Sequence, residues 1–258
     1  MCCDFENHDT LYINTYTILK MKLDILAFGA HPDDVELGCS GTIAKEISLG
    51  KKVGIIDLTR GELGTRGSVE IRNSESAKAS EILGVAAREN LDMRDGFFVN
   101  DEAHQMKIIQ MLRKYQPEIV LCNAIDDRHI DHGKGSKLVS DSCFLSGLRM
   151  IETSLYGENQ AAWRPKVVYH YIQWKNLEPD LVVDISEFMD VKMESILAYS
   201  SQFYNPNTNE PESPISSKNF LDSVKYRAQD LGRIVGVDYA EGFTVERYLT
   251  VNSLSDLK

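Results

Sequence analysis

"AFGAHPDDVELGCSGTIAK" (residues 27–45) is the stretch that decides the fold class. An apolar run over residues 23–30 ends just before Pro32, and a helical pattern over residues 35–49 then stops at Gly50. A short apolar run bounded by charge is typical of a buried parallel strand, and glycine commonly ends a helix. The stretch therefore predicts a strand, a polar turn and a helix.

The same alternation continues along the chain. Further strands are predicted at 52–58, 90–93, 118–123, 167–172 and 181–185, and further helices at 69–83, 104–115, 136–150, 186–199 and 217–235. This order favours an α/β protein with a Rossmann-like three-layer fold, a mostly parallel sheet of order 3-2-1-4-5, and a C-terminal elaboration after residue 160. We expect residues 21–258 to form a single domain. Residues 1–20 are expected to be a loose extension or a misassigned start.

Composition and charge exclude several classes of protein. The net charge is −11, from 28 basic and 39 acidic residues, and no basic block is present, which argues against nucleic-acid binding. No stretch approaches the roughly 18 apolar residues of a membrane span. Five cysteines without CxxC spacing are typical of reduced thiols, so we expect a cytoplasmic protein that binds neither nucleic acid nor membrane.

Two polar clusters end two predicted strands. The first is the His31-Pro32-Asp33-Asp34 turn, and the second is "DDRHIDH" (residues 126–132) after the fourth strand. In a sheet of order 3-2-1-4-5 the first and fourth strands are neighbours, and ligands bind beyond their carboxyl ends, where the strand order reverses. The two clusters are therefore expected to face each other across one crevice.

Two histidines and a carboxylate with open positions suit a catalytic zinc, or ferrous iron in a facial triad. His31 and Asp34 are three residues apart, so one turn brings them together, and His132 is the third candidate ligand. Asp33 must project differently, which favours a role as general base. His129 is placed to stabilise an oxyanion or protonate a leaving amine, with Asp131 or Asp127 holding it charged.

Simpler interpretations stay open at this point. Asp34 is also a good residue for an ordinary helix N-cap, and His129 and His132 also fit solvated loop histidines. The arginines of residues 60–72 also fit an ordinary solvated surface.

The residues "FGAHPDDVELGCSGTI" (28–43) and "DRHIDH" (127–132) resemble the signatures of the LmbE/PIG-L family of zinc-dependent de-N-acetylases. The segments "DLTRGELGTRGS" (57–68) and "RNSESAKASEILGV" (72–85) look like its bacillithiol-biosynthesis deacetylase branch. The resemblance covers roughly residues 22–245. It implies a Rossmann-like fold and removal of the N-acetyl group from a GlcNAc–malate conjugate, with release of acetate.

The resemblance also implies roles for individual residues. Carried over by position, these are His31, Asp34 and His132 as ligands of one Zn²⁺ per chain, Asp33 as general base, His129 with Asp131 as its partner at the tetrahedral intermediate, and Arg72 and Glu75 near the sugar. Another divalent metal such as Fe²⁺ fits the same ligands. Members of this branch are often hexamers, so we expect a homo-oligomer.

A malate conjugate is a dianion, whereas this chain is strongly acidic, so local arginines must recognise the substrate. Bidentate contact with carboxylates favours arginine over lysine. The candidates are Arg60, Arg66, Arg72 and Arg164.

Three other functions remain in view. A non-haem iron enzyme would use the same triad. A nucleotide-binding module is disfavoured because the G-x-G-x-x-G spacing is absent. A deacetylase for another amino-sugar conjugate, of the chitobiose or mycothiol type, differs only in loops, including residues 202–217, which we expect to form a surface loop with the character of a lid.

Overall fold

The central strand, β1 (Ile25–Gly29), is buried along its whole length and ends directly before the polar turn. The computed structural model describes residues 21–256, so the expectation for residues 1–20 lies outside the described residues. Side chains alternate between the two faces of a strand. Accordingly, Leu26 and Phe28 join one apolar cluster, and Ile25 and Ala27 join the other.

Seven strands form the main sheet, in the order β3-β2-β1-β4-β7-β9-β8. The bounds are β2 Val53–Thr59, β3 Ala87–Met93, β4 Ile119–Cys122, β7 Val167–Tyr171, β8 Leu181–Asp184 and β9 Ala240–Val245. The pairs from β3 to β7 are parallel, and β9 is antiparallel to both β7 and β8. The predicted α/β class with a mostly parallel sheet is confirmed. A separate hairpin pairs β5 (Ser154–Leu155) with β6 (Glu158–Asn159).

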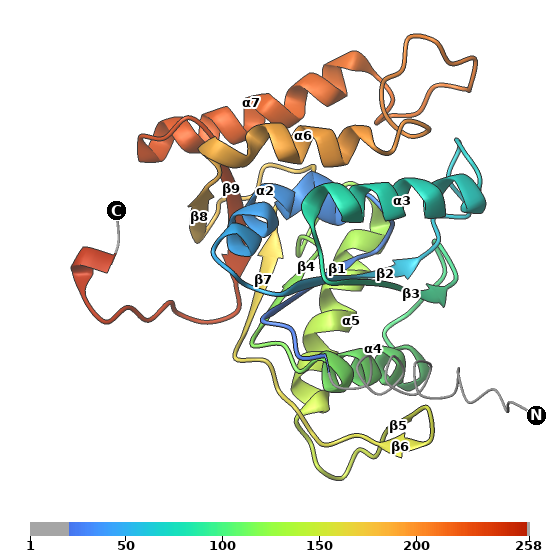
Figure 1. The fold of residues 1–258 in the computed structure, drawn as a ribbon, viewed down its shortest axis with the longest axis vertical. Helices are drawn as coiled ribbons and strands as arrows, with labels where there is room; N and C mark the ends of the chain where they lie inside the picture. The colour runs from blue at the N-terminus through green and yellow to red at the C-terminus, as the bar shows by residue number, and fades with distance from the viewer. Residues whose placement is uncertain (1–20, 257–258) are drawn as a thin grey trace, which may run out of the picture.

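The helices complete a layered arrangement (Figure 1). Their bounds are α2 Asp34–Ser48, α3 Val69–Leu83, α4 Glu102–Tyr115, α5 Ile130–Ser146, α6 Met189–Leu197 and α7 Lys218–Val235, with short 3₁₀ turns at Ser186–Phe188 and Leu254–Asp256. In Figure 1, α2 and α3 cover one face of the sheet, α4 and α5 cover the other, and α6 and α7 lie outside α2 and α3. Among the described residues, no helix has the length and apolar character needed to cross a bilayer.

The hairpin of β5 and β6 was not expected from the sequence, and two further differences lie close to the polar clusters or the central strands. Helix α5 begins at Ile130 rather than 136, because two glycines, Gly133 and Gly135, obscure the helical pattern of its first turns. Strand β9 was not predicted, since "AEGFTV" contains a charge and a glycine, yet it is buried between β7 and β8. The second polar cluster therefore lies on the first turn of a helix.

Helix α2 is broken at Cys39, whose φ is −148°. Side chains from the C-terminal part of the chain bind backbone carbonyls and amides on either side of this break. Lys192 Nζ donates to the carbonyls of Glu36 (3.1 Å) and Leu37 (2.8 Å), and Glu241 accepts from the Gly41 and Thr42 amides at 3.0 and 2.7 Å. Lys192 and Glu241 also pair with each other at 2.7 Å, and both are buried.

A close approach of the sheet to α2 occurs at Gly38. A Cβ at this position would lie 2.1 Å from the ring of Tyr171, so only glycine fits without movement of the ring. The Tyr171 hydroxyl donates to the Phe28 carbonyl at 2.9 Å, which fixes the ring against β1. These contacts set the start of α2, and with it Asp34, relative to the sheet.

Candidate active site

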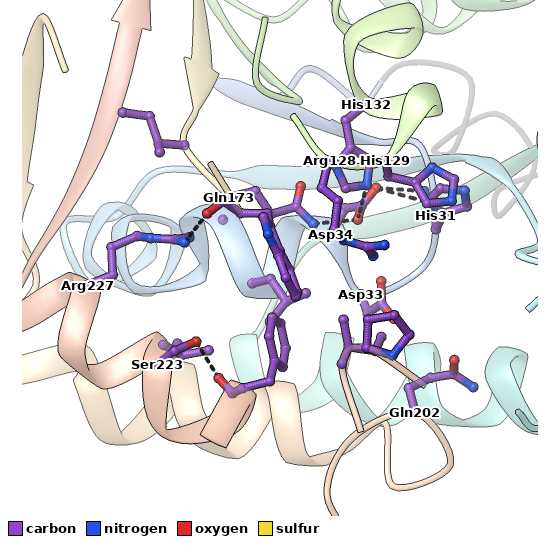
Figure 2. Close-up of a pocket in the computed structure, with 18 of the residues that line it drawn as sticks. His31, Asp33, Asp34, Arg128, His129, His132, Gln173, Gln202, Ser223 and Arg227 are labelled. Carbon is purple, nitrogen blue, oxygen red and sulfur yellow. Dashed lines mark hydrogen bonds and ion pairs between the residues drawn. The ribbon is translucent and has the colours of Figure 1, made fainter. Parts of the chain in front are cut away.

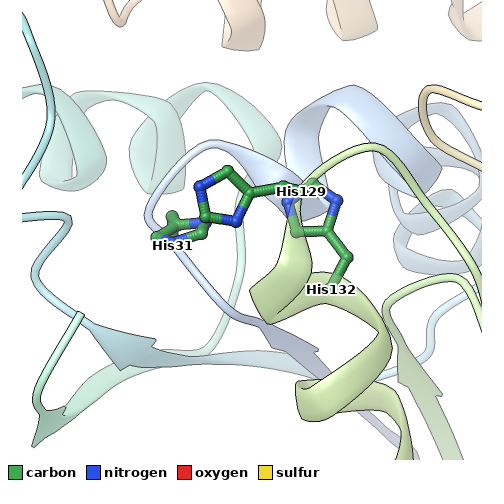
Figure 3. Close-up of side chains that lie close together, drawn as sticks. All are labelled: His31, His129 and His132. Carbon is green, nitrogen blue, oxygen red and sulfur yellow. The ribbon is translucent and has the colours of Figure 1, made fainter. Parts of the chain in front are cut away.

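The two polar clusters lie together at the carboxyl ends of β1 and β4. Figure 3 shows His31 from the turn after β1 facing His129 and His132 from the start of α5. The ring centroid of His31 is 4.6 Å from that of His129 and 5.7 Å from that of His132. The ring nitrogens of the three imidazoles come within 4.8 Å of one another. The spacing therefore lets side chains from both clusters share one ion.

Asp34 lies between two of these imidazoles. Its Oδ2 is 3.4 Å from His31 Nδ1, and its Oδ1 is 3.2 Å from His132 Nε2. Burial alone would raise the pKa of Asp34, but His132 and His31 hold it well below its usual range. Asp34 is the first residue of α2 and follows the N-cap position at Asp33, so its carboxylate is not an ordinary helix cap and faces the imidazoles instead.

A second carboxylate stands behind each of the two imidazoles that flank Asp34, those of His31 and His132. His132 Nδ1 lies 2.7 Å from Asp127 Oδ2, and His31 Nε2 lies 3.0 Å from Asp95 Oδ1 and 3.6 Å from Asp131 Oδ2. A carboxylate on the outer nitrogen is the usual arrangement around a metal-bound histidine.

These carboxylates favour positive charge between them. Burial lowers the pKa of His132, but Asp34 and Asp127 outweigh it and raise this pKa to about 9. The same positive charge can be held as protons on the imidazoles or as a divalent cation between them. The donor set of His31, Asp34 and His132 suits Zn²⁺, and it also suits Fe²⁺. His129 is a further candidate ligand, because its ring nitrogens lie close to those of His31 and His132.

The predicted partner of His129 is wrong. The Asp131 carboxylate accepts from the Gly96 amide and Lys134 Nζ and faces His31 rather than His129. His129 Nδ1 accepts instead from the Asp131 backbone amide at 3.3 Å. Burial, with His31 and His132 nearby, lowers the pKa of His129 and outweighs the opposing effect of Asp34 and Asp131, which favours the neutral imidazole.

Asp33 lines the same cavity as the imidazoles and is held by Arg72. Arg72 Nη2 lies 2.9 Å from Asp33 Oδ2 and 2.5 Å from the Pro32 carbonyl. Asp33 adopts a φ of 113°, a strained conformation for a residue with a Cβ. Burial raises the pKa of Asp33 to about 7, although Arg72 opposes this rise. Arg72 is thus better described as a residue that holds Asp33 than as a binder of a substrate carboxylate.

A cavity of about 290 Å³ opens from these residues toward α7 (Figure 2). Besides Arg72, three guanidinium groups line it, from Arg66, Arg128 and Arg227. Arg128 stacks over Trp174 at 4.5 Å, and Arg227 donates to the Trp174 carbonyl. Arg66 is buried, its two bonds to backbone carbonyls are long at 3.4 Å each, and its Nε has no hydrogen-bond partner within residues 21–256.

Several residues of the cavity were missed by sequence reasoning. Gln173 and Trp174 follow β7, and Arg227 lies in α7, where no motif marks them. Arg128 directly precedes His129 in the second cluster, so that position was a usable signal. Part of the predicted loop also contributes, since Gln202, Ser213, Pro214 and Ile215 line the cavity.

Three predicted contacts with substrate are absent from this cavity. Arg164 donates to the Phe144 carbonyl at 2.8 Å and stacks on the Phe144 ring, at a different surface, so its assignment to the substrate is wrong. Arg60 pairs with Asp92 on the surface at 2.5 Å. Glu75 is buried but does not line the cavity, and its carboxylate accepts from the amide and hydroxyl of Ser201, both at 2.7 Å.

Similar proteins are found for both the sequence and the structure. The sequence model of the PIG-L family, described as GlcNAc-PI de-N-acetylase, matches residues 26–143, which include both polar clusters. The diacetylchitobiose deacetylase of Thermococcus kodakarensis is 28% identical over 218 residues, covering 78% of this chain and 80% of that protein.

Two solved structures have the same fold. A conserved protein of Thermus thermophilus is 37% identical, with a TM-score of 0.78, and the match covers 89% of this chain and 98% of that one. The N,N'-diacetylchitobiose deacetylase of Pyrococcus horikoshii, complexed with an inhibitor, is 23% identical, with a TM-score of 0.72 and coverage of 98% and 100%. At 23% identity the likeness shows the fold alone.

Proposed function

We propose that this chain, whose residues 26–143 match the sequence model of the PIG-L family, is a divalent-metal-dependent hydrolase that removes the N-acetyl group from an N-acetylglucosamine conjugate. One observation carries the proposal. A buried carboxylate, Asp33, is held by Arg72 at the edge of a cavity whose floor is formed by His31, Asp34 and His132. A base beside a metal site is what hydrolysis requires.

His31, Asp34 and His132 would hold the metal, with Zn²⁺ as the first candidate and Fe²⁺ as the second. When bound, such a cation supplies Lewis acidity, which polarises the amide carbonyl and makes water a better nucleophile at neutral pH. Asp127 and Asp95, behind the two imidazoles, would keep the metal-facing nitrogens in place.

Asp33 would take the proton as the oxygen of water bonds to the acetyl carbon. Its elevated pKa suits this task near neutral pH, since a base works best when its pKa lies close to the operating pH. The proton then passes to the sugar nitrogen as the C–N bond breaks, and acetate and a free amine leave. His129, half-buried and beside His31 and His132, would donate a hydrogen bond to the oxyanion.

For the substrate we propose GlcNAc–malate, as in bacillithiol biosynthesis. The guanidinium groups of Arg66, Arg128 and Arg227 support an anionic conjugate, because they line the cavity and arginine side chains bind carboxylates well. N,N'-diacetylchitobiose is the second candidate, since the relatives described above carry that activity in their names.

The test compares three substrates with the purified protein. Protein freed of metal and reloaded with Zn²⁺ or Fe²⁺ would be assayed for acetate and amine release from GlcNAc–malate, GlcNAc and N,N'-diacetylchitobiose. We expect release only with metal, and the highest kcat/KM on GlcNAc–malate. Equal rates on chitobiose and GlcNAc–malate would contradict the malate assignment, and no acetate from any of the three would contradict the deacetylase assignment.

A further inference from the structure

A chain of hydrogen bonds with one fixed direction ends on the carboxylate of Asp34. It starts at the backbone amide of Ala30, which donates to Asn123 Oδ1 at 2.9 Å. A backbone amide can only donate, so this contact identifies which end of the Asn123 side chain is the oxygen. Asn123 Nδ2 must then point toward Asp34, where it lies 3.0 Å from Oδ2.

The orientation of the Asn123 amide also determines the orientation of the Gln173 amide. Asn123 Nδ2 lies 3.4 Å from Gln173 Oε1, which leaves Gln173 Nε2 to donate to Asp34 Oδ1 at 2.6 Å. Each oxygen of Asp34 therefore receives one neutral amide donor. The His31 backbone amide adds a further bond to Oδ2 at 2.9 Å.

The residues of this hydrogen-bond series come from the ends of three neighbouring strands. Ala30 follows β1, Asn123 follows β4, and Gln173 comes after β7. Asn123 is 1% exposed and Gln173 is 8% exposed, so water competes little with these bonds. Behind Asn123, its carbonyl lies 3.2 Å from the His170 ring, which holds the backbone at this point.

We infer that Asn123 and Gln173 are positioning residues that fix the orientation of the Asp34 carboxylate toward a metal held with His31 and His132. This inference rests on the proposed metal-dependent function. The amides stop the carboxylate from rotating, so that Oδ1 faces His132 Nε2 at 3.2 Å and Oδ2 faces His31 Nδ1 at 3.4 Å. Groups that orient a metal ligand typically change metal affinity by about 10–100-fold when they are removed.

Two variants test the inference without changing a metal ligand. Gln173→Leu removes one amide with little change of volume, and it leaves no backbone group without a partner. Asn123→Leu removes the other amide, but it also deprives the Ala30 amide of its acceptor. Gln160→Leu is the matched control, because Gln160 is a partly buried glutamine whose side chain donates to the Gln110 carbonyl, away from the site.

The readouts are the Kd for Zn²⁺, from competition with a chromophoric chelator, and the Tm of the metal-free protein. We expect Kd to rise by about 10–100-fold in Gln173→Leu and Asn123→Leu and to change by less than about twofold in Gln160→Leu. If Asn123→Leu does not fold, Gln173→Leu decides alone. A Kd for Gln173→Leu equal to that of the parent protein would overturn the inference.

If the proposed function itself is wrong, the results differ from those expected when only the positioning role is wrong. In that case the unaltered protein would bind no Zn²⁺ stoichiometrically, or would release no acetate from any of the three substrates. An unaltered protein that binds Zn²⁺ tightly, together with a Gln173→Leu variant that binds equally well, would remove only the positioning role.

Discussion

Arg72 Nη2 lies 2.9 Å from Asp33 Oδ2, and both side chains are buried. The guanidinium also binds the Pro32 and Gly61 carbonyls, so it joins three separate points around the strained turn. This one side chain therefore acts on both the position and the charge of the proposed base.

Replacement of Arg72 should change the pH dependence of the reaction. The base must be ionised, so activity should fall as pH drops through the pKa of Asp33, which burial raises to about 7. Arg72 lowers this pKa, and Arg72→Ala should therefore move the acidic limb of the kcat/KM profile to higher pH. Profiles measured from about pH 5 to 9 check this. A variant with reduced rate but an unmoved limb would leave Arg72 with a purely structural role.

Asp33→Asn should retain the metal and lose the reaction. General bases contribute about 10²–10⁴-fold to rate, so we expect kcat to fall by that amount while bound Zn²⁺ stays stoichiometric by elemental analysis. The control is Asp92→Asn, an exposed aspartate that also has a positive φ, of 53°. Parental activity in Asp33→Asn would contradict the base assignment.

Arg227 should distinguish charged from neutral substrates. A hydrogen bond to a charged group is worth about 1.5–3 kcal/mol, so Arg227→Gln should raise KM for GlcNAc–malate by about 10–100-fold. The KM for N,N'-diacetylchitobiose should change by less than about threefold, because that substrate carries no carboxylate. Arg164→Gln, on a different surface, should alter neither value. Equal effects of Arg227→Gln on both substrates would argue against a carboxylate contact.

The pair of His170 and Glu246 should make stability depend on pH. Burial lowers the pKa of His170, but Cys122 and Glu246 outweigh it and raise this pKa to about 10, above the unfolded value of about 6.5. The resulting stabilisation is fully present below about pH 6.5 and is lost as pH rises through about 10. His170 Nε2 lies 3.0 Å from Glu246 Oε1, and the glutamate is 41% exposed, so solvent screening reduces its contribution to about 1 kcal/mol.

Glu246→Gln should accordingly lower the free energy of unfolding by about that amount near pH 6, and by less at about pH 9. Urea denaturation at both pH values measures the difference. A loss that is equal at the two pH values would show that the charge of His170 is not involved.

The sequence predicted the sheet order around β1 and β4 because each strand is a short apolar run with a polar end. Adjacency of those two strand ends then follows from the topology of open parallel sheets. No topological rule predicts which side chains of later elements reach the site. The positions of Arg227 and Gln173, for example, depend on how α7 and β7 pack. For the same reason, a residue predicted to line the site, Arg164, lies elsewhere. It was chosen for its charge alone, and packing against Phe144 placed it elsewhere.

The sequence also did not determine which histidine each aspartate of the second polar cluster faces. Asp127 and Asp131 flank His129 in the sequence, so either could have faced it. Once the chain turns into α5 at Ile130, the geometry of the first helical turn directs Asp127 to His132 and Asp131 toward His31. Helix start positions are the least certain part of a sequence-based assignment, and here the start decides which imidazole each carboxylate meets.

The break in α2 at Cys39 bears on how the protein matures in the cell. The amides and carbonyls released at this break are bound by Glu241 and Lys192, which lie 200 and 156 residues further along the chain than the groups they bind. The helix that begins with Asp34 therefore cannot reach its final shape before those later segments have been synthesised and have docked. We expect capture of a metal ion at Asp34 to follow the docking of β9.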